Sequence, residues 1–432
     1  MAVSLAACSN SNDDANGGSK ASGGDAAACA PADGPVTIEY WNQVPGIDEV
    51  IKVWNEENPD IQVVSKNISN DSVGQISNAL KANAAPELAQ IGYDQLPFFR
   101  LQDAYVDASA CEDAVKAAGD FVAWTWSQTS FDGEGIYAIP QDTGPLAMYY
   151  RTDIFADNGL EVPKTWDEYR KDAEALKDKG IDIMFFDPKN AEMFYGYMTQ
   201  AHANMYSYSD DEWHVHIQND NAKKVTDYWQ GMIDDGLVRT DLANNSTPMW
   251  SAYADDSMAT FVTAAWGYSL VRDNLPEQAG KWAVAPLPTW SEDDKASGNW
   301  GGSTVAFMKG NEHLYESVKF NLWLNNSPEA LAMTNELGGL YPASNNGLAL
   351  PQLEEGVEYY GGQKIFDVFA ESSANIDPDF PWAPTQKTVS LALQDNISKA
   401  VNGDITLWDA LGETEKAAIQ SMVDQDIPVE QK

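Results

Sequence analysis

The sequence predicts an α/β protein with more than one domain, and three observations carry this prediction. Stretches with strand-like and helix-like spacing of apolar residues alternate from Val36 onward. The chain has 432 residues, of which 44% are hydrophobic, enough for two or three domains. No apolar run approaches the roughly 20 residues that cross a bilayer, so we expect a soluble mature chain.

The folded part of the chain is predicted to begin with a strand followed by a helix. Residues 36–41 alternate as a strand, and the apolar residues of 47–54 have helical spacing before Pro59 ends the run. A second strand is predicted at 61–64, then a helix around Ile76, and a third strand that ends near Tyr93. This alternation is typical of a parallel sheet.

Polar and aromatic residues follow three of the predicted strands. Ligands of open α/β sheets lie beyond the carboxyl ends of the strands, so these residues are expected on one rim. The sequence therefore predicts one ligand cleft there, with the candidates Trp41, Asn42, Tyr93, Asp94, Gln141 and Asp142.

The second part of the chain is predicted to open another α/β region. Thr165 and Glu168 form a capping box before a helix that ends near Gly180. Helices are expected near 191–205 and 221–235, and strands at 282–286 and 303–309. The proline-rich APLPTW segment indicates a crossing between domains. Ser327 and Pro328 begin a further helix as N-cap and first helical residue, and most of the remainder is predicted to be helical.

Charge and composition narrow the class of ligand. The 26 Lys and Arg residues against 66 Asp and Glu residues give a net charge of −40, which repels phosphate backbones and anionic headgroups. We expect neither nucleic acid nor a membrane surface as a partner.

The 15 Trp residues exceed the 14 Phe residues, and flat rings suit the faces of sugars. Helical spacing predicts core packing for Trp54, Trp229, Trp323 and Trp408.

Few residues are available for a metal site. The chain has four His residues, and the close pair His214 and His216 has no neighbouring Cys. We expect neither a metal nor a cofactor.

The N-terminal residues resemble a lipoprotein leader. The string LAAC ends at Cys8 and is similar to a bacterial lipobox, in which the cysteine carries the lipid; a polar, small-residue stretch follows it. We expect residues 1–35 to comprise a truncated signal remnant, the lipobox and a flexible tether. The folded chain would then lie at the extracellular face of a bacterial membrane, attached only through lipid.

Cys29 and Cys111 remain once Cys8 is assigned to lipid. An even number of cysteines in a chain that looks exported permits one disulfide, while two buried, unpaired thiols are the alternative. We predict the bonded form, although the sequence alone leaves both open.

Longer strings resemble a known family. The stretch GIYAIPQDTGPLAMYYRTDIFADNGLEVPKTWDEYRKDAEAL resembles the extracellular solute-binding proteins of ABC importers, in the carbohydrate-binding group that includes maltose-binding protein. Four further stretches resemble the same family in the expected order: WNEENPDIQV, MATFVTAAWGYSLV, WGGSTVAFMKGNEHLYESVKFNLWL and GDITLWDAL.

The resemblance implies a two-lobed periplasmic-binding-protein-like fold with the ligand cleft between the lobes, which close on a sugar. By analogy, lobe 1 comprises 36–144 plus 299–345, and lobe 2 comprises 145–298 plus 346–432. It further implies binding of a neutral oligosaccharide, delivery to ABC transporter permease subunits, no catalysis, and a monomer.

The resemblance also adds site residues. The family often places a sugar-binding acid at the position of Asp142, and Trp266 matches its aromatic residue after a small-residue strand. Trp300 beside Gly301 and Gly302 resembles its glycine pair, which lets backbone approach a ligand. Further candidates for ligand contact are Tyr195, Trp250, Tyr341 and Trp382.

Two other classes of protein compete with this interpretation. A glycoside hydrolase also has an acidic cleft lined by tryptophans and needs two carboxylates, but the sequence shows no specific catalytic constellation. A lipoprotein adhesin with a carbohydrate-binding module would share the tether and the tryptophans, but it requires an all-β pattern, which the capped helices oppose.

Overall fold

The computed structural model describes residues 29–68, 71–131, 133–377 and 380–430. One mixed sheet has the strand order β2-β1-β3-β9-β4-β7, with β8 also paired to β4, and a separate hairpin joins β5 to β6. The strands are β1 (Val36–Asn42), β2 (Ile61–Asn67), β3 (Leu88–Gly92), β4 (Ala138–Arg151), β5 (Tyr206–Ser209), β6 (Glu212–Val215), β7 (Thr260–Ala264), β8 (Trp282–Pro286) and β9 (Asn299–Phe307).

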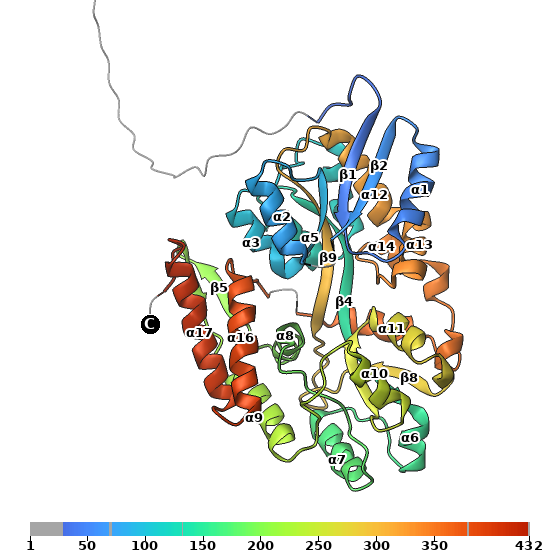
Figure 1. The fold of residues 1–432 in the computed structure, drawn as a ribbon, viewed down its shortest axis with the longest axis vertical. Coiled ribbons are helices and arrows are strands. Elements are labelled where there is room, and N and C mark those ends of the chain that lie inside the picture. Colours follow the sequence, from blue (N-terminus) through green and yellow to red (C-terminus); the bar gives the residue numbers. More distant parts are fainter. Residues whose placement is uncertain (1–28, 69–70, 132, 378–379, 431–432) are drawn as a thin grey trace, which may run out of the picture.

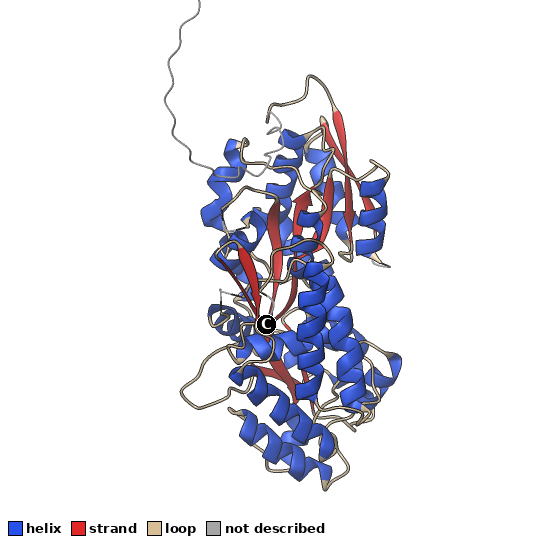
Figure 2. Cartoon of the chain, turned by 90° about the vertical axis from the view of Figure 1, so that its left-hand side faces the viewer, coloured by secondary structure: helices blue, strands red, loops and turns tan. Residues whose placement is uncertain are grey.

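Helices cover the two ends of this sheet (Figures 1 and 2). Around its upper part in Figure 1 lie α1 (Ile47–Glu57), α2 (Ser72–Lys81), α3 (Leu96–Leu101), α5 (Ala123–Ser130), α12 (Leu314–Asn326), α13 (Pro328–Gly338) and α14 (Asn345–Leu348). The other helices are α4 (Glu112–Lys116), α6 (Thr152–Asp157), α7 (Trp166–Lys177), α8 (Ala191–Gln200), α9 (Asp220–Asp234), α10 (Thr247–Ala254), α11 (Gly267–Asn274), α15 (Ile365–Ala374), α16 (Gln386–Val401) and α17 (Leu407–Val423).

The sheet is parallel only in part, so the expectation of a parallel sheet is wrong beyond its first three strands. β1 pairs in parallel with β2 and with β3, whereas β9 is antiparallel to β3 and to β4. The first three strands are joined by helical crossovers, which make neighbours parallel. β9 instead arrives from the other half of the molecule and enters the sheet from the opposite end.

Strand β4 runs through both halves of the molecule (Figure 1). Its first half pairs with β9 and its second half with β7 and β8. The predicted strand end at Gln141 and Asp142 is therefore wrong, since both residues lie inside this 14-residue strand. Irregular register between Pro140 and Asp142, and again between Thr143 and Pro145, lets the strand continue while its pairing changes.

Two pairs of hydrophobic clusters give the chain two lobes. In the first lobe, buried residues of β1, β3 and β9 pack with those of α1 and α12. The second lobe has Trp166 and Trp229 fully buried at its centre, where Trp166 follows the predicted capping box of Thr165 and Glu168. The capping box is confirmed, and Trp54, Trp229, Trp323 and Trp408 pack in or against the clusters as predicted.

The proline-rich segment after β8 does not cross between lobes, contrary to the sequence prediction. Pro286 pairs with Ala147 of β4, Leu287 is buried in the second lobe, and the Thr289 amide donates to the Lys164 carbonyl. The chain crosses later, where β9 begins. There, a Cβ on Gly144 would lie 1.9 Å from the Trp300 carbonyl oxygen, so only glycine lets β4 and β9 pass each other this closely.

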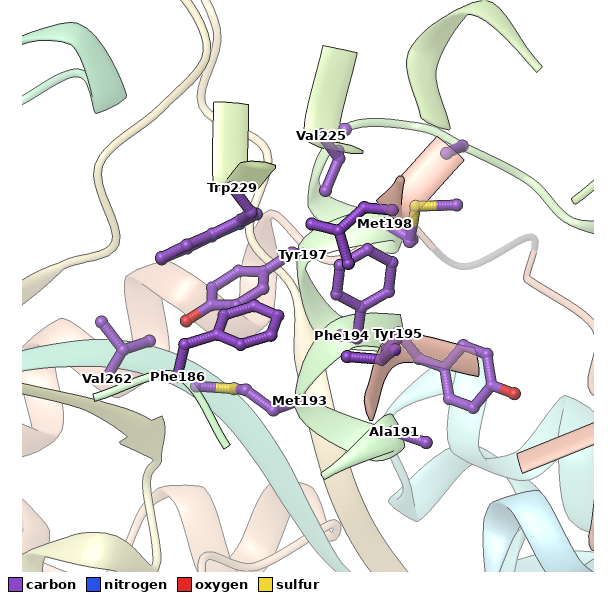
Figure 3. Close-up of a cluster of buried hydrophobic side chains, with 14 of the residues drawn as sticks. Phe186, Ala191, Met193, Phe194, Tyr195, Tyr197, Met198, Val225, Trp229 and Val262 are labelled. Carbon is purple, nitrogen blue, oxygen red and sulfur yellow. The ribbon is translucent and has the colours of Figure 1, made fainter. Parts of the chain in front are cut away.

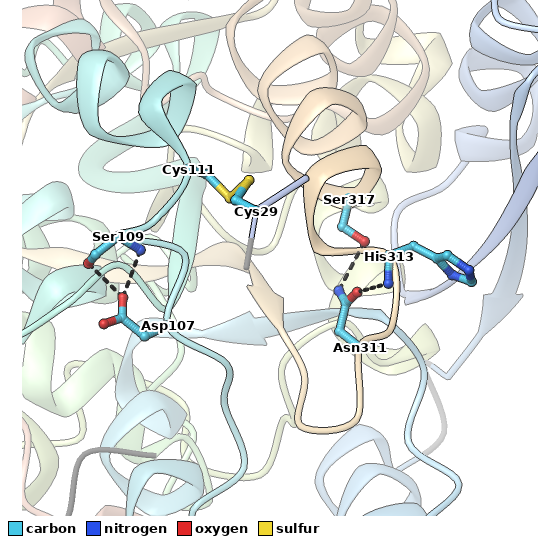
Figure 4. The surroundings of a disulfide bond; sticks show 7 residues. All are labelled: Cys29, Asp107, Ser109, Cys111, Asn311, His313 and Ser317. Atoms are coloured by element: carbon cyan, nitrogen blue, oxygen red, sulfur yellow. Dashed lines mark hydrogen bonds between the residues drawn. A yellow bond between two sulfur atoms is a disulfide. The ribbon is translucent and has the colours of Figure 1, made fainter. Parts of the chain in front are cut away.

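Cys29 and Cys111 form a disulfide in the first lobe (Figure 4). It joins the segment before β1 to the residue that precedes α4. Cys8 and the rest of 1–28 lie outside the described residues. Within the described parts of the chain, none of the helices combines the length and the apolar character needed to cross a membrane.

Candidate functional site

Five aromatic rings form a continuous series from the first lobe to the second. Consecutive ring centroids are 5.2 Å apart for Tyr93 and Trp124, 5.9 Å for Trp124 and Phe380, 5.6 Å for Phe380 and Trp382, and 5.8 Å for Trp382 and Tyr195. Tyr93 follows β3 and Trp124 lies in α5, whereas Tyr195 lies in α8 of the second lobe. We call these five residues the ring series.

The ring series contains polar atoms that the protein leaves without partners. The indole nitrogens of Trp124 and Trp382 are buried and make no hydrogen bond to the described residues. The hydroxyls of Tyr93 and Tyr195 are also buried; Thr125 lies near the first, and Ser390 and Gln386 lie near the second. Burial raises the pKa of both tyrosines, so their hydroxyls stay protonated. An unsatisfied buried donor costs about 1–3 kcal/mol, which a ligand that supplies an acceptor recovers.

Helix α8 carries aromatic rings in different directions. In Figure 3 the Tyr195 ring lies on the opposite side of the helix from the rings of Tyr197 and Trp229, although all three belong to the second lobe's hydrophobic cluster. Tyr195 also contacts Trp382, which packs against hydrophobic clusters of both lobes. Tyr195 is therefore placed to act at the junction of the lobes.

A second pair of rings lies where β9 begins. Trp266 and Trp300 pack edge to face with centroids 5.1 Å apart, and the Trp266 indole nitrogen donates to the Trp300 carbonyl oxygen over 3.4 Å. Both rings are partly exposed. Trp300 also lines a narrow cavity of about 20 Å³, on the side where Phe194 and Tyr197 of α8 lie.

Gly301 and Gly302 connect this pair to the ring series. Both have positive φ, 74° and 89°, which glycine adopts without strain. A Cβ on Gly302 would lie 2.9 Å from the Asp142 carbonyl oxygen and 3.0 Å from the Tyr93 ring. A side chain there would displace the backbone of β4 or the Tyr93 ring, so this close approach requires glycine.

Asp142 lies in a buried polar network beneath Tyr93. The Ser303 hydroxyl donates to the Asp142 carboxylate and accepts a hydrogen bond of 2.9 Å from the Gln90 amide. Burial raises the pKa of Asp142 to about 6, although the bond from Ser303 opposes the shift. The carboxyl is only 5% exposed, so it reaches a ligand only at the inner wall of the junction.

Replacing Asp142 by Asn is expected to change the pH dependence of stability. A carboxyl with a raised pKa in the folded chain stabilises it fully below its unfolded value of 3.8, and this contribution is lost as the pH rises through 6. Asparagine keeps an acceptor for Ser303 and does not ionise. The melting temperature of Asp142→Asn relative to wild type should therefore be higher at pH 7.5 than at pH 4; an equal difference at both values would contradict the assignment.

Asp94 and Glu192 bring two further carboxyl groups to the junction from opposite lobes. Asp94 lies in the short turn η1 (Tyr93–Gln95) after β3, and Glu192 lies in the first turn of α8. Burial and the charge of Glu192 raise the pKa of Asp94 to about 7. Burial, with a smaller effect of Asp187, raises the pKa of Glu192.

Sequence reasoning missed three of these residues. Glu192 precedes the candidate Tyr195 by three residues on one helix, and this spacing could have identified it. Trp124 and Phe380 carry no comparable signal, because only the fold brings them between Tyr93 and Trp382.

Four predicted site residues are used inside the fold instead. The side-chain Oδ1 of Asn42 accepts a hydrogen bond from the Val44 amide and so caps its own turn, and Gln141 is buried against Tyr40 and Ser303. The other two are packed in or against the second lobe's core, Trp250 beside Phe261 and Tyr341 beside Phe366.

Trp41 has one feature of a ligand-binding residue and one that opposes ligand contact. Its indole nitrogen is buried and finds no partner in the described part of the chain, but the Lys66 ammonium lies 3.5 Å from the ring centroid and covers one face. Stacking of a sugar on that face would require Lys66 to move. We therefore do not include Trp41, Asn42, Gln141, Trp250 or Tyr341 in the site we propose.

Known proteins share both the sequence pattern and the fold. The family profile described as "Bacterial extracellular solute-binding protein" matches residues 49–359. The arabinooligosaccharide-binding protein of Halalkalibacterium halodurans is 23% identical over 355 residues, which cover 78% of this chain and 79% of that protein.

Solved structures extend the likeness over the whole fold. The galacto-N-biose/lacto-N-biose I-binding protein of an ABC transporter from Bifidobacterium longum, in complex with lacto-N-biose, superposes with a TM-score of 0.84 and 26% identity, covering 92% of this chain and 100% of that one. The ABC-transporter-associated binding protein from B. animalis subsp. lactis, in complex with β-1,6-galactobiose, gives a TM-score of 0.81 with 23% identity and the same coverage.

Proposed function

Because the chain belongs to the bacterial extracellular solute-binding proteins, we propose that it binds a neutral oligosaccharide between its two lobes and delivers it to an ABC importer. The buried indole N–H donors of Trp124 and Trp382, which have no partner among the described residues, carry this proposal. They come from both lobes, and they offer hydrogen bonds beside flat apolar faces. A sugar unit presents the complement, since its hydroxyl oxygens accept hydrogen bonds and its C–H faces pack on rings.

The charges at the junction favour a neutral ligand. The ionisable side chains that we assign to the site are Asp94, Asp142 and Glu192, which accept hydrogen bonds from hydroxyls when ionised and repel anions. The site proposed for the sugar comprises the ring series, these three carboxyl groups, the Trp266 and Trp300 pair, and the backbone at Gly301 and Gly302.

We propose that the two lobes close around the sugar and that the loaded chain meets its transporter at the membrane. The first lobe comprises about 36–144 and 299–345, and the second about 145–298 and 346–432; the segment around Phe380 reaches back onto the first lobe's cluster. The lobes close on the sugar because it contacts both of them. The chain acts as a monomer, presents the loaded form to permease subunits, and is held at the extracellular face of the membrane by lipid on Cys8.

The proposed role is binding without chemistry. The oligosaccharide-binding relatives support this role. Product analysis after long incubation with the bound sugar separates the receptor from a glycoside hydrolase. Reproducible hydrolysis at catalytic protein concentrations, lost in Asp94→Asn or Glu192→Gln, would overturn the assignment.

A thermal-shift screen tests the ligand class. The panel contains arabinotriose, lacto-N-biose, galacto-N-biose, β-1,6-galactobiose, lactose and maltotriose, with a galacturonic acid oligomer as the anionic control. A sugar at a hundredfold its dissociation constant stabilises the fold by about 2.7 kcal/mol, which raises the melting temperature measurably. We expect such a shift with at least one neutral sugar and none with the anionic control; a shift with the anion alone would contradict the proposal.

A further inference from the structure

The narrow cavity beside Trp300 is a part of the second lobe that the sugar contacts proposed above leave unused. It lies between α8, β7 and the segment 184–187 that precedes α8. Most of its walls are apolar, and they include the side chains of Met184, Phe186, Phe194 and Val262. Its volume is about 20 Å³. One water molecule needs about 10–15 Å³ on this scale, so the cavity admits a small substituent and not a whole sugar ring.

Two polar atoms of the cavity walls have no partner among the described residues, the Tyr197 hydroxyl and the side-chain oxygen of Asn244. Tyr197 is 1% exposed, and its ring packs on Trp229 with centroids 4.6 Å apart. In Figure 3 its hydroxyl end lies toward Phe186 and Val262, which also line the cavity. Burial raises the pKa of Tyr197, so the hydroxyl keeps its proton and can donate a hydrogen bond.

Asp187 holds Asn244 in place at the cavity. The Asp187 carboxylate accepts hydrogen bonds of 2.9 Å from the Lys189 amide and 2.8 Å from the Asn244 amide. The segment before α10 is thereby fixed to the segment before α8, and the Asn244 side chain adds an acceptor to the cavity wall. Asp187 itself lines the cavity, so its negative charge disfavours an anionic group there.

Trp300 connects the cavity to the site proposed for the sugar. α8 packs against β9, and a Cβ on Gly196 of α8 would lie 3.3 Å from the Asn299 carbonyl oxygen. The Trp300 ring lines the cavity, packs on Trp266 and is partly exposed. A sugar unit that contacts this pair of rings is therefore placed to direct one substituent into the cavity.

We infer that the cavity binds the acetamido group of an N-acetylated sugar unit, so that oligosaccharides containing an N-acetylhexosamine are the preferred ligands. This inference rests on the proposed function. The acetamido carbonyl oxygen accepts a hydrogen bond from the Tyr197 hydroxyl, and the acetamido N–H donates one to the Asn244 oxygen. The methyl group packs against the apolar walls.

Other substituents of sugars match the cavity less well. A hydroxyl group has no apolar part for the walls, and an O-acetyl ester has no donor for Asn244. A carboxylate would lie beside the like charge of Asp187. The acetamido group combines an acceptor, a donor and a methyl group without a charge, and it leaves the ligand neutral.

Calorimetry with matched pairs of sugars tests the inference. The members of each pair differ only in the acetamido group: N-acetyllactosamine against lactose, and lacto-N-biose against galactosyl-β-1,3-glucose. Wild type should bind the acetamido member at least tenfold more tightly in one pair or both, because its partner leaves the polar atoms unpaired and the apolar cavity unfilled. Tyr197→Phe keeps the ring and removes the donor. It should weaken binding of the acetamido member about three- to tenfold and leave that of its partner unchanged.

Tyr206→Phe provides the matched control. Tyr206 is another buried tyrosine of the second lobe whose hydroxyl lacks a partner among the described residues, but it does not line the cavity. This variant should keep the wild-type preference. Without sugar, Tyr197→Phe should melt no lower than wild type, because its hydroxyl bonds to none of the described residues. Asn244→Ala should show the same selective loss of affinity as Tyr197→Phe.

Equal affinity for both members of each pair would overturn the inference and leave the proposed function intact. An equal loss for both members in Tyr197→Phe, or a lower melting temperature of this variant without sugar, would assign the hydroxyl to the fold and overturn it as well. Binding of arabinotriose without binding of either acetamido sugar would have the same meaning. Absence of binding by every sugar would overturn the proposed function, and the inference with it.

Discussion

Removal of the Cys29–Cys111 disulfide is expected to lower the free energy of unfolding by about 4–5 kcal/mol. The bond closes a loop of 82 residues, and the chain-entropy model assigns such a loop about 4.5 kcal/mol. Cys111 is buried at the start of α4, and the Ala32 amide after Cys29 donates to the Glu316 carboxylate, so the bond ties the chain before β1 to the first lobe.

Urea unfolding of the oxidised wild type and of the double variant Cys29→Ser, Cys111→Ser measures this difference. Sugar affinity should be unchanged, because Cys29 precedes β1 whereas Tyr93 and Asp94 of the site follow the carboxyl end of β3, the neighbour of β1. Thiol titration of the denatured, unreduced protein provides the control, and two reactive thiols from the described domain would contradict the bond. Equal stability of the two proteins would contradict the predicted contribution.

Replacing Trp382 by Ala is expected to weaken sugar binding by about 2 kcal/mol or more, roughly thirtyfold, if this ring is the central anchor. Trp382 contacts Phe380 on one side and Tyr195 on the other, and its indole nitrogen has no partner among the described residues. The substitution removes a ring face, a donor, and the contact that joins the clusters of both lobes. Isothermal calorimetry with the best sugar of the screen measures the loss.

Trp250→Ala provides a matched control. Trp250 is also a partly buried tryptophan of the second lobe, but it packs against Phe261 and Tyr253 away from the ring series. This variant should lose thermal stability without sugar and keep wild-type affinity. The reverse outcome, with wild-type affinity in Trp382→Ala and a loss in Trp250→Ala, would move the site to the interior of the second lobe.

The sequence predicted the local elements well because their signals are local. The capping box at Thr165 and the proline at the start of α13 determine helix starts through residues three or four positions apart. The full length of β4 does not follow from its own residues, because the strand continues by pairing with β7, β8 and β9, which come from distant segments of the chain. The antiparallel direction of β9 likewise depends on its pairing with β3 and β4, which are far from it in the sequence.

The site residues also differ in whether a local sequence signal identifies them or whether only the fold brings them together. Tyr93 and Asp94 could be placed from a strand end, and Trp266 and Trp300 from the family pattern. Trp124 and Phe380 join the site only through contacts between segments more than 250 residues apart along the chain. Asn42 and Gln141 occupy predicted positions, yet neighbouring backbone and side chains satisfy their amides. A sequence pattern does not distinguish a satisfied amide from a free one.

The indole N–H signals of the tryptophans test the central claim most directly, because Trp124 and Trp382 offer donors from the two lobes that the described residues leave without a partner. The spectrum of protein labelled with nitrogen-15 tryptophan, assigned with Trp124→Phe and Trp382→Phe, is recorded with and without the best neutral sugar of the screen. The account predicts that both signals move on binding while that of Trp408, at the outer edge of the second lobe's core, does not. Saturation by a tightly bound sugar with both signals unmoved would contradict a ligand held between the lobes.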